Sequence, residues 1–372
     1  MTDTIARVEC RLVNVPLTRP FAFATNTLTS LPYAWCRIET GDGVVGYGEA
    51  PTYWDPTGET QFAAAGSIAL WTPLLLGSNP MAWRAVISQI ASIARGSFAA
   101  RCAVETAILD IASQRLGVPA YSMLGGPQST IVVNAVLPLN DAPLGEIKEF
   151  IGAKIGAGYS TVKIKSSSRS SRRDNDLVEA TRELLPDAVV FVDANQSWRE
   201  GPAPLRRVQA LADRGLAWIE QPLAAGDVAG HLDLMRRSPI PVMIDESVTD
   251  QQSLGHWLGG GLANAHLNIK LAKAGGPFSA LAQVDLADAL HVRYSVGSMI
   301  ESGLGMLANY HFARSVRPLT CGFDVYDSVN DGLDVGLRQE GSAMHRASDD
   351  IPGLGYDSSA LDRFFYSQVA LP

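Results

Sequence analysis

The segment Ala188-Val-Val-Phe-Val-Asp193 decides the fold that we expect for this chain. Its unbroken apolar run is typical of a strand that is buried on both faces of a parallel sheet. A carboxylate ends the run, and the carboxyl end of a parallel strand is where active sites of closed parallel sheets are built. The segment therefore predicts a buried strand with a functional group at its end.

Seven further segments have the same character and alternate with amphipathic helical stretches. They are Ile131–Leu137, Thr161–Lys165, Leu216–Glu220, Pro241–Asp245, Ala265–Lys270, Arg293–Ser298 and Leu319–Asp324. Eight parallel strands with helices between them are typical of a (β/α)8 barrel. We therefore expect an α/β fold built on a (β/α)8-type barrel, a modified TIM barrel.

The first part of the chain follows a different pattern, which predicts a separate α+β domain. Tyr33–Thr40 has the composition of a strand, and Asp42-Gly43 behind it is a hairpin signal. A helical stretch follows, and Gly125-Gly-Pro127 marks the boundary with the barrel. The expected parts are the α+β domain at residues 1–128, the barrel at residues 129–340 and a C-terminal tail at residues 341–372.

Composition and charge narrow the classes of protein to which the chain can belong. Its 372 residues carry 30 basic and 38 acidic side chains, a net charge of −8, which argues against a nucleic-acid binder. No apolar run is long enough to span a membrane, and the first residues do not have the pattern of a signal peptide. The four cysteines are dispersed without a CxxC pair, as expected for reduced thiols. We therefore expect a cytoplasmic enzyme without nucleic-acid or membrane partners.

Charged residues interrupt the apolar runs at one place, the carboxyl end of the expected strands. Such residues are spaced 28, 27, 25, 25 and 54 apart, close to one βα unit or two, and they are Lys165, Asp193, Glu220, Asp245, Lys270 and Asp324. Charges at the end of an apolar strand are costly unless they are paired or bind a metal. Six such charges in register therefore predict an active site at the carboxyl-terminal mouth of the barrel.

The three successive carboxylates predict a metal site. Asp193, Glu220 and Asp245 come from neighbouring strands, and hard oxygen ligands suit Mg²⁺. We expect one Mg²⁺ ion, with Mn²⁺ as a substitute, and not zinc, because no His or Cys joins the set. Asn195 and Glu246 adjoin these carboxylates, and we expect them to support the ligands, although Glu246 has an ion pair with Lys270 as its alternative.

Two lysines predict proton transfer beside this metal. Lys165 and Lys270 are four strands apart in an eight-stranded barrel, so we expect them on opposite sides of the mouth. One would remove a proton from the carbon next to a substrate carboxylate, and the other would return a proton to the opposite face. Lys163 points the same way as Lys165 and would contact the substrate carboxylate, or would pair inside the barrel with a carboxylate such as Glu220.

These motifs resemble the enolase superfamily, in its mandelate racemase/muconate lactonizing enzyme group. The matching text is Thr161-Val-Lys-Ile-Lys165, Asp193-Ala-Asn195, Glu220-Gln-Pro222, Asp245-Glu-Ser247, Lys270-Leu-Ala-Lys-Ala-Gly-Gly276, Val296-Gly-Ser-Met-Ile-Glu-Ser302 and Gly46-Tyr-Gly-Glu-Ala50. The resemblance implies that the first domain and the tail form a cap over the barrel mouth. Its loops at residues 21–26 and 53–55 would then select the substrate, with Trp54 in contact with it or simply packed within the cap.

The ends of the last two strands bear on the reaction. The strand before Ser298 carries no histidine, unlike the branches of this superfamily that use a His–Asp pair, and we expect Ser298 to contact the substrate. Dipeptide epimerases of this family have Asp-x-Asp at the end of the last strand, where this chain has Asp324-Val-Tyr-Asp327. Asp324 is therefore a further candidate substrate contact, and the roles of Asp327 and of the basic run at residues 169–173, expected as a solvated loop, stay open.

The resemblance implies Mg²⁺-dependent abstraction of a proton next to a carboxylate, through an enediolate. The leading reaction is racemisation or epimerisation of an amino-acid derivative or small dipeptide. The alternatives are cycloisomerisation of a muconate-type diacid and an elimination of the dehydratase kind. From other classes, an NAD(P)-linked barrel reductase and a catalytically silent relative stay open, although the acidic triad and the two lysines argue against them. We expect a small carboxylate as substrate and a homo-oligomer.

Overall fold

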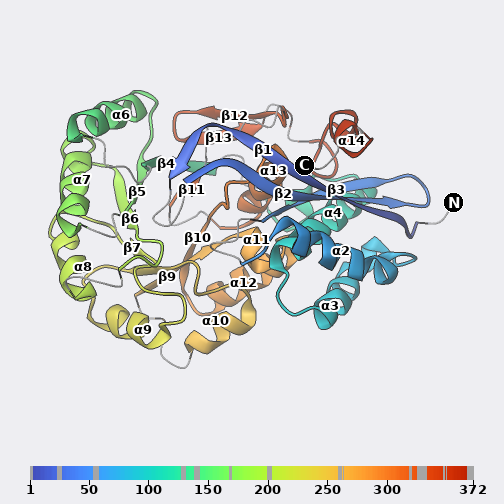
Figure 1. Cartoon of the computed structure of the whole chain (residues 1–372), viewed down its shortest axis with the longest axis horizontal. Helices are drawn as coiled ribbons and strands as arrows, with labels where there is room; N and C mark the ends of the chain where they lie inside the picture. Colours follow the sequence, from blue (N-terminus) through green and yellow to red (C-terminus); the bar gives the residue numbers. More distant parts are fainter. Residues whose placement is uncertain are drawn as a thin grey trace.

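A computed structural model describes residues 3–22, 27–52, 58–126, 131–137, 143–166, 170–198, 203–258, 262, 264–317, 321–324, 333–346, 348 and 350–366. In Figure 1 the barrel occupies one side of the molecule, with α6 to α9 along its outer rim, and the N-terminal sheet and helices lie on the other side. The expected fold class, a (β/α)8-type barrel with an α+β cap, is confirmed.

The cap begins with an antiparallel sheet of β1 (Ile5–Ala22), β2 (Thr27–Thr40) and β3 (Val45–Pro51). The hairpin expected at Asp42-Gly43 joins β2 to β3, with Gly43 in the left-handed region that such a turn requires. The helices that follow are α2 (Gln61–Leu75), η1 (Pro80–Ala82), α3 (Trp83–Ile93), α4 (Phe98–Leu116) and α5 (Ala120–Met123).

Helix α4 is buried along most of its length because β3 lies directly against it. A Cβ atom on Gly46 would come within 2.2 Å of the Ala107 carbonyl oxygen, and one on Gly48 within 2.0 Å of the Ala103 carbonyl oxygen. Glycine at these two positions therefore allows the helix and the strand to touch through their backbones.

The barrel strands follow the eight segments expected from the sequence. They are β4 (Ile131–Leu137), β5 (Thr161–Lys165), β6 (Val189–Asp193), β7 (Ile219–Glu220), β8 (Val242–Ile244), β9 (Ala265–Ile269), β10 (Arg293–Val296) and β11 (Phe323–Asp324). Strands β4 to β10 pair in parallel in chain order, and β11 pairs in parallel with β4. On the other side of β11, the Cys321 N–H donates to Ser295 Oγ of β10 at 3.3 Å, which brings the two ends of the sheet together.

Helices alternate with these strands along the chain, and α6 to α9 form the outer rim of the barrel in Figure 1. The helices that follow the barrel strands are α6 (Leu144–Gly156), α7 (Ser171–Leu184), α8 (Pro204–Ala212), α9 (Val228–Arg237), α10 (Gln251–Leu258), α11 (Leu271–Ala274), α12 (Pro277–Ala289) and α13 (Gly303–Ser315). We expected a loop for the basic run at residues 169–173. This expectation is wrong for Arg172 and Arg173, which lie in the first turn of α7. Ser170 accepts a hydrogen bond from the Arg173 N–H at 3.2 Å and so caps this helix.

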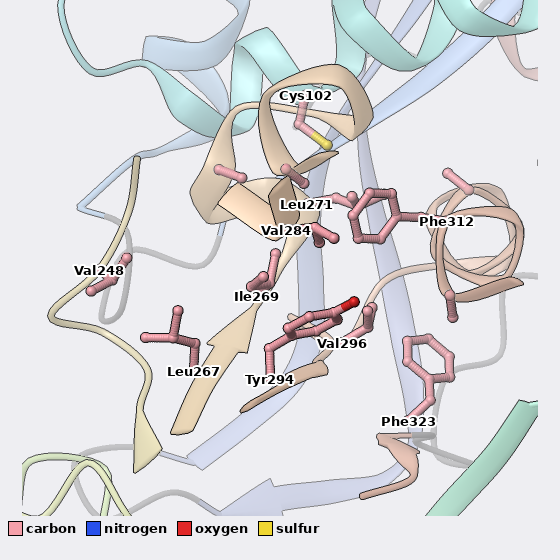
Figure 2. Close-up of a cluster of buried hydrophobic side chains, with 14 of the residues drawn as sticks. Cys102, Val248, Leu267, Ile269, Leu271, Val284, Tyr294, Val296, Phe312 and Phe323 are labelled. Carbon is pink, nitrogen blue, oxygen red and sulfur yellow. The ribbon is translucent and has the colours of Figure 1, made fainter. Parts of the chain in front are cut away.

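One apolar core runs from the barrel into the cap. Figure 2 shows part of it, with side chains of β9, β10, α12 and α13 beside Cys102 of α4. Because the core is continuous, burial of apolar surface holds the cap and the barrel together.

The C-terminal segment contacts both parts. Strands β12 (Leu337–Glu340) and β13 (Ala343–Arg346) form a hairpin, and β13 pairs antiparallel with β4 of the barrel. Helix α14 (Ser358–Tyr366) lies against the cap, where Asp362 accepts hydrogen bonds from Arg37 at 3.1 Å and from the Tyr47 hydroxyl at 2.5 Å. The domain boundaries at residues 128 and 340 stay a prediction. Within the described part of the chain, no helix combines the length and the apolar composition that crossing a membrane requires.

Candidate active site

Three buried carboxylates converge at the carboxyl ends of neighbouring strands. Asp193 and Glu220 are the last residues of β6 and β7 and lie side by side in the parallel register, and Asp245 follows β8 directly. Each offers an oxygen atom within 4.8 Å of the others, and all three side chains are buried. The structure thus brings the three expected metal ligands together.

The backbone around these residues is fixed by side chains of the same motifs. Gln221 accepts hydrogen bonds from the Asp245 N–H at 2.9 Å and from the Ser247 N–H at 3.2 Å, which joins the ends of β7 and β8. Asn195 donates its backbone N–H to Asp193 Oδ1 at 2.9 Å. These contacts orient two of the carboxylates before any ligand binds.

The two expected proton-transfer lysines flank the carboxylates. Lys165 Nζ lies 2.7 Å from Asp193 Oδ2, and Lys270 Nζ lies 2.6 Å from Asp245 Oδ2. Strands β6, β7 and β8, which carry the carboxylates, separate the strand of Lys165 from the strand that precedes Lys270. The amine groups therefore approach the carboxylate cluster from two sides.

Lys163 is buried inside the barrel, a position that the sequence alone does not determine. It is 1 % exposed, and its Nζ atom lies 3.0 Å from Glu220, 3.1 Å from Asp193 and 2.8 Å from Asp324. This is the interior pairing that we weighed as the second role of Lys163. Any contact with a substrate stays a prediction.

Burial and the lysine charges act against each other on the pKa values of this cluster. Burial alone would raise the pKa of Asp193, but Lys165 and Lys163 outweigh it and lower that pKa to about 2. Burial, reinforced by the Asp193 charge, raises the pKa of Glu220 to about 8. Burial would lower the pKa of Lys270, but Asp245 outweighs it and raises that pKa. The positive charges of the lysines therefore offset the negative charges of Asp193 and Asp245 more fully than the negative charge of Glu220.

Of the expected supporting residues, Asn195 contacts Lys165 and Asp193 directly, and Glu246 contacts Asn195. Asn195 accepts a hydrogen bond from Lys165 Nζ at 2.9 Å and donates one to Glu246 Oε1 at 3.1 Å. Burial, with the charges of Asp245 and Asp193 beside it, raises the pKa of Glu246 to about 7. Asn195 therefore links Lys165 to Asp193 on one side and to Glu246 on the other.

Of the remaining candidate residues, the structure describes Ser298 and Asp324. Ser298 is buried, donates to Glu301 Oε2 at 2.5 Å and accepts from the Ile300 N–H at 3.0 Å, so its hydroxyl is engaged within its own loop. Asp324 accepts from Asn134 Nδ2 at 2.8 Å in addition to its pair with Lys163. Trp54 and Asp327 lie outside the described residues.

Sequence reasoning missed three residues of this cluster. Asn268 Nδ2 donates to Glu220 Oε1 at 2.7 Å, and Lys273 contacts the Asp245 carboxylate. Asn134 joins β4 to Asp324. Asn268 could have been found, because it lies two residues before Lys270 and therefore faces the same side of its strand.

The donor set fits a divalent cation. Glu220 Oε2 and Asp245 Oδ1 are buried and accept no hydrogen bond within the described part of the chain, although Lys163 and Lys273 lie close to them. Buried carboxylate oxygens without a hydrogen bond have lone pairs free for a metal ion. Together with Asp193, these carboxylates on rigid strand ends could hold one ion.

Comparison with known protein families identifies the family of this chain. Residues 6–125 match the mandelate racemase / muconate lactonizing enzyme N-terminal domain, and residues 146–360 match the enolase C-terminal domain-like family. The chain belongs to the mandelate racemase/muconate lactonizing enzyme family of the enolase superfamily. The resemblance noted from the motifs is therefore confirmed.

Two similar proteins of this family, an epimerase and a cycloisomerase, are isomerases. The chain is 33 % identical to the L-Ala-D/L-Glu epimerase of Bacillus subtilis over 365 residues, which covers 96 % of this chain and 98 % of the epimerase. It is 30 % identical to muconate cycloisomerase 1 of Pseudomonas putida, covering 87 % of each chain. The chain is thus an isomerase of the enolase superfamily, and its relatives fit the expected epimerisation, with cycloisomerisation as the alternative.

Solved structures agree with this placement. A substrate-liganded complex of the L-Ala-D/L-Glu epimerase from Bacillus subtilis superimposes with a TM-score of 0.87 at 32 % identity, covering 95 % of this chain and 99 % of the epimerase. A dipeptide epimerase from Enterococcus faecalis, complexed with Mg and a dipeptide, has a TM-score of 0.87 at 27 % identity, with the same coverage. A member of the family thus holds Mg, and the acidic triad of this chain could hold a metal ion.

Proposed function

We propose that this protein is a Mg²⁺-dependent racemase or epimerase, which removes the proton next to the carboxylate of an amino-acid derivative or small dipeptide. The observation that carries the proposal is the position of Lys165 and Lys270 on two sides of one buried carboxylate triad. Inversion at a carbon needs a base on one face and an acid on the other, and this arrangement supplies both.

The roles of the residues follow from their contacts. Asp193, Glu220 and Asp245 would hold one Mg²⁺ ion, which Mn²⁺ could replace. When bound, the ion would stabilise the negative charge that develops on the substrate carboxylate. Lys165 and Lys270 would exchange the proton as base and acid through an enediolate, while Asn195 and Glu246 hold Lys165 in place. We propose Lys163, Asp324, Ser298 and Trp54 as substrate contacts.

The second candidate is a muconate-type cycloisomerase. Similarity to muconate cycloisomerase 1 of Pseudomonas putida over most of both chains favours it. In that reaction one lysine would transfer the proton and the other would mainly stabilise charge, so the two would contribute unequally. An elimination of the dehydratase kind would use the same carboxylate chemistry and is the least favoured candidate.

A substrate screen in D2O tests the proposal. Purified protein with Mg²⁺ would be incubated with libraries of dipeptides, N-acyl amino acids and N-succinyl amino acids, and separately with cis,cis-muconate. Proton NMR would follow loss of the α-proton, and chiral chromatography would follow inversion. Inversion with deuterium incorporation is expected for at least one amino-acid derivative. Turnover of muconate alone would contradict the proposal and establish the second candidate.

Location and assembly complete the proposal. We propose a cytoplasmic enzyme, which the free thiols of Cys10, Cys36, Cys102 and Cys321 support, since reducing compartments preserve free cysteines. We also propose a homo-oligomer, and the exposed apolar side chains of Phe62 and Leu70 on α2 support self-association. Light scattering behind a sizing column should give a mass above 39.7 kDa, and a monomer at micromolar protein would contradict this part.

A further inference from the structure

A cavity of about 600 Å³ lies at the amino-terminal end of the barrel, away from the carboxylates. Its walls come from the residues that begin or precede β8, β9 and β10, whereas the metal and lysine residues stand at the opposite ends of the same strands. Leu262, Leu290 and Val292 provide apolar wall, and His266 and Arg293 provide polar wall. A ligand in this cavity would therefore not occupy the active site.

His266 brings a buried imidazole ring to the wall of the cavity. Its side chain is 4 % exposed, and it faces the barrel interior because it lies two and four residues before Asn268 and Lys270 on one strand. Its Nδ1 atom is buried and has no hydrogen-bond partner in the described part of the chain. The ring of Trp218 lies 5.5 Å away, and its Nε1 atom is likewise buried without a partner there. Of these two residues only His266 lines the cavity, so its ring is the one that a ligand there would meet.

Arg293 supplies positive charge beside His266. The two residues are direct neighbours in the parallel register of β9 and β10, so their side chains leave the sheet on the same face. Arg293 is exposed, and no ion pair or hydrogen bond of its side chain occurs among the residues that the structure describes. Burial and the Arg293 charge lower the pKa of His266 to about 4, so this ring is neutral at pH 7 and can donate one N–H.

The other polar groups of the described cavity wall are not acidic. His291, which also lines the cavity, adds a second exposed imidazole. On α12, Asp288 is paired with Arg317. The described wall of the cavity thus contains cationic and neutral polar groups and apolar side chains, without a carboxylate.

We propose that this cavity is a second ligand site, which binds a small organic acid with one carboxylate on an apolar body. Arg293 binds the carboxylate, for which its planar fork of donors is suited, and His266 donates a hydrogen bond to it. Leu262, Leu290 and Val292 contact the apolar body. The site depends on none of the residues of the proposed reaction.

Ligand-observed fluorine NMR with 4-fluorobenzoate tests the site on the full-length Mg²⁺-loaded protein. The proposed active site would also bind carboxylates. The measurement therefore compares wild type with Arg293→Gln, and only the part of the binding that depends on Arg293 reports on this cavity. We expect a dissociation constant on the order of 1 mM for this part, and a loss of at least about tenfold in Arg293→Gln. Leu290→Trp, which fills the cavity without touching a polar group, should abolish the same part.

Arg84→Gln is the matched control, because Arg84 is an exposed arginine of α3 that does not line the cavity. Unchanged binding in this variant is expected. Equal weakening in Arg84→Gln and Arg293→Gln would mean general attraction to surface charge and would overturn the site. Binding that is the same in wild type, Arg293→Gln and Leu290→Trp would overturn it as well.

Discussion

Gly297 directly follows β10 and lies against the side-chain end of Lys270. A Cβ atom there would lie 2.2 Å from Asn268 Oδ1 and 2.8 Å from Lys270 Cε. Asn268 in turn holds Glu220 through a hydrogen bond of 2.7 Å. A single methyl group at position 297 would therefore displace a proposed base and the partner of a proposed metal ligand together.

Gly297→Ala should consequently lower kcat for α-proton exchange by about tenfold to a hundredfold, since small misplacements of reacting groups have effects of this size. The overall fold should persist, as judged by circular dichroism. Gly255→Ala is the matched control, because a Cβ atom at Gly255 of α10 would meet nothing within 4 Å. Equal kcat values for both variants and wild type would contradict this role of Gly297.

A single residue, Glu220, also tests the predicted metal site. Glu220→Gln should weaken Mg²⁺ binding by at least about a hundredfold, because even changes behind a metal ligand cost 10- to 100-fold. Turnover should fall with it, and titration calorimetry with Mg²⁺ measures the affinity. Glu179→Gln, at an exposed ion pair on α7, should bind Mg²⁺ like wild type. A Glu220→Gln protein that turns over normally in excess chelator would show that the metal site is wrongly placed.

At the scale of elements, buried carboxylates of the cap bind the backbone of its neighbours. Glu105 of α4 accepts the N–H groups of Phe278 and Ser279, at 3.1 Å each, at the start of α12. Asp110 of α4 accepts the Leu354 N–H of the C-terminal segment at 2.8 Å. Glu49 of β3 accepts the Ser302 N–H, just before α13, at 3.0 Å. The cap is therefore attached to the barrel and to the C-terminal segment by polar contacts as well as by the shared core.

The pKa of Glu105 gives these contacts a pH dependence. Burial raises it from 4.5 to about 7. Between these values the unfolded chain has released the proton while the folded protein keeps it, so stability falls as pH rises through this window, by up to about 3 kcal/mol. Below pH 4.5 both states are protonated and the effect vanishes. Burial likewise raises the pKa of Asp110 to about 6 and that of Glu49 to about 8, which acts in the same direction.

Glu105→Gln should therefore reduce the fall of the thermal midpoint between pH 5 and pH 7, because the amide does not titrate. Differential scanning fluorimetry across this range measures the slope. Glu179→Gln should keep the wild-type slope. An identical slope in wild type and Glu105→Gln would mean that Glu105 does not titrate in this window.

At the scale of the whole molecule, the sequence predicts the barrel well because its signal is local and repeated. Each buried strand is an apolar run, and six of the eight runs end in a charge one or two βα units after the last, so Asp193 and Glu220 can be placed together without coordinates. The β12–β13 hairpin was not predicted, because it is short and β12 is largely exposed. Lys273 was missed because it reaches Asp245 from a helix, where the two-residue period of a strand does not apply. Pairings across the barrel, such as Lys163 with Asp324, join residues far apart in the chain and need the closed sheet to be seen.

The central claim is that two lysines act on opposite faces of one carbon, and α-proton exchange in D2O tests it most directly. With each stereoisomer of the best substrate, Lys165→Ala should lose exchange for one isomer only, and Lys270→Ala for the other. Racemisation should disappear in both variants, because each direction needs one lysine as base and the other as acid. If wild-type enzyme placed no solvent deuterium at the α-carbon of either recovered isomer, two-base racemisation would be contradicted and muconate-type chemistry would take its place.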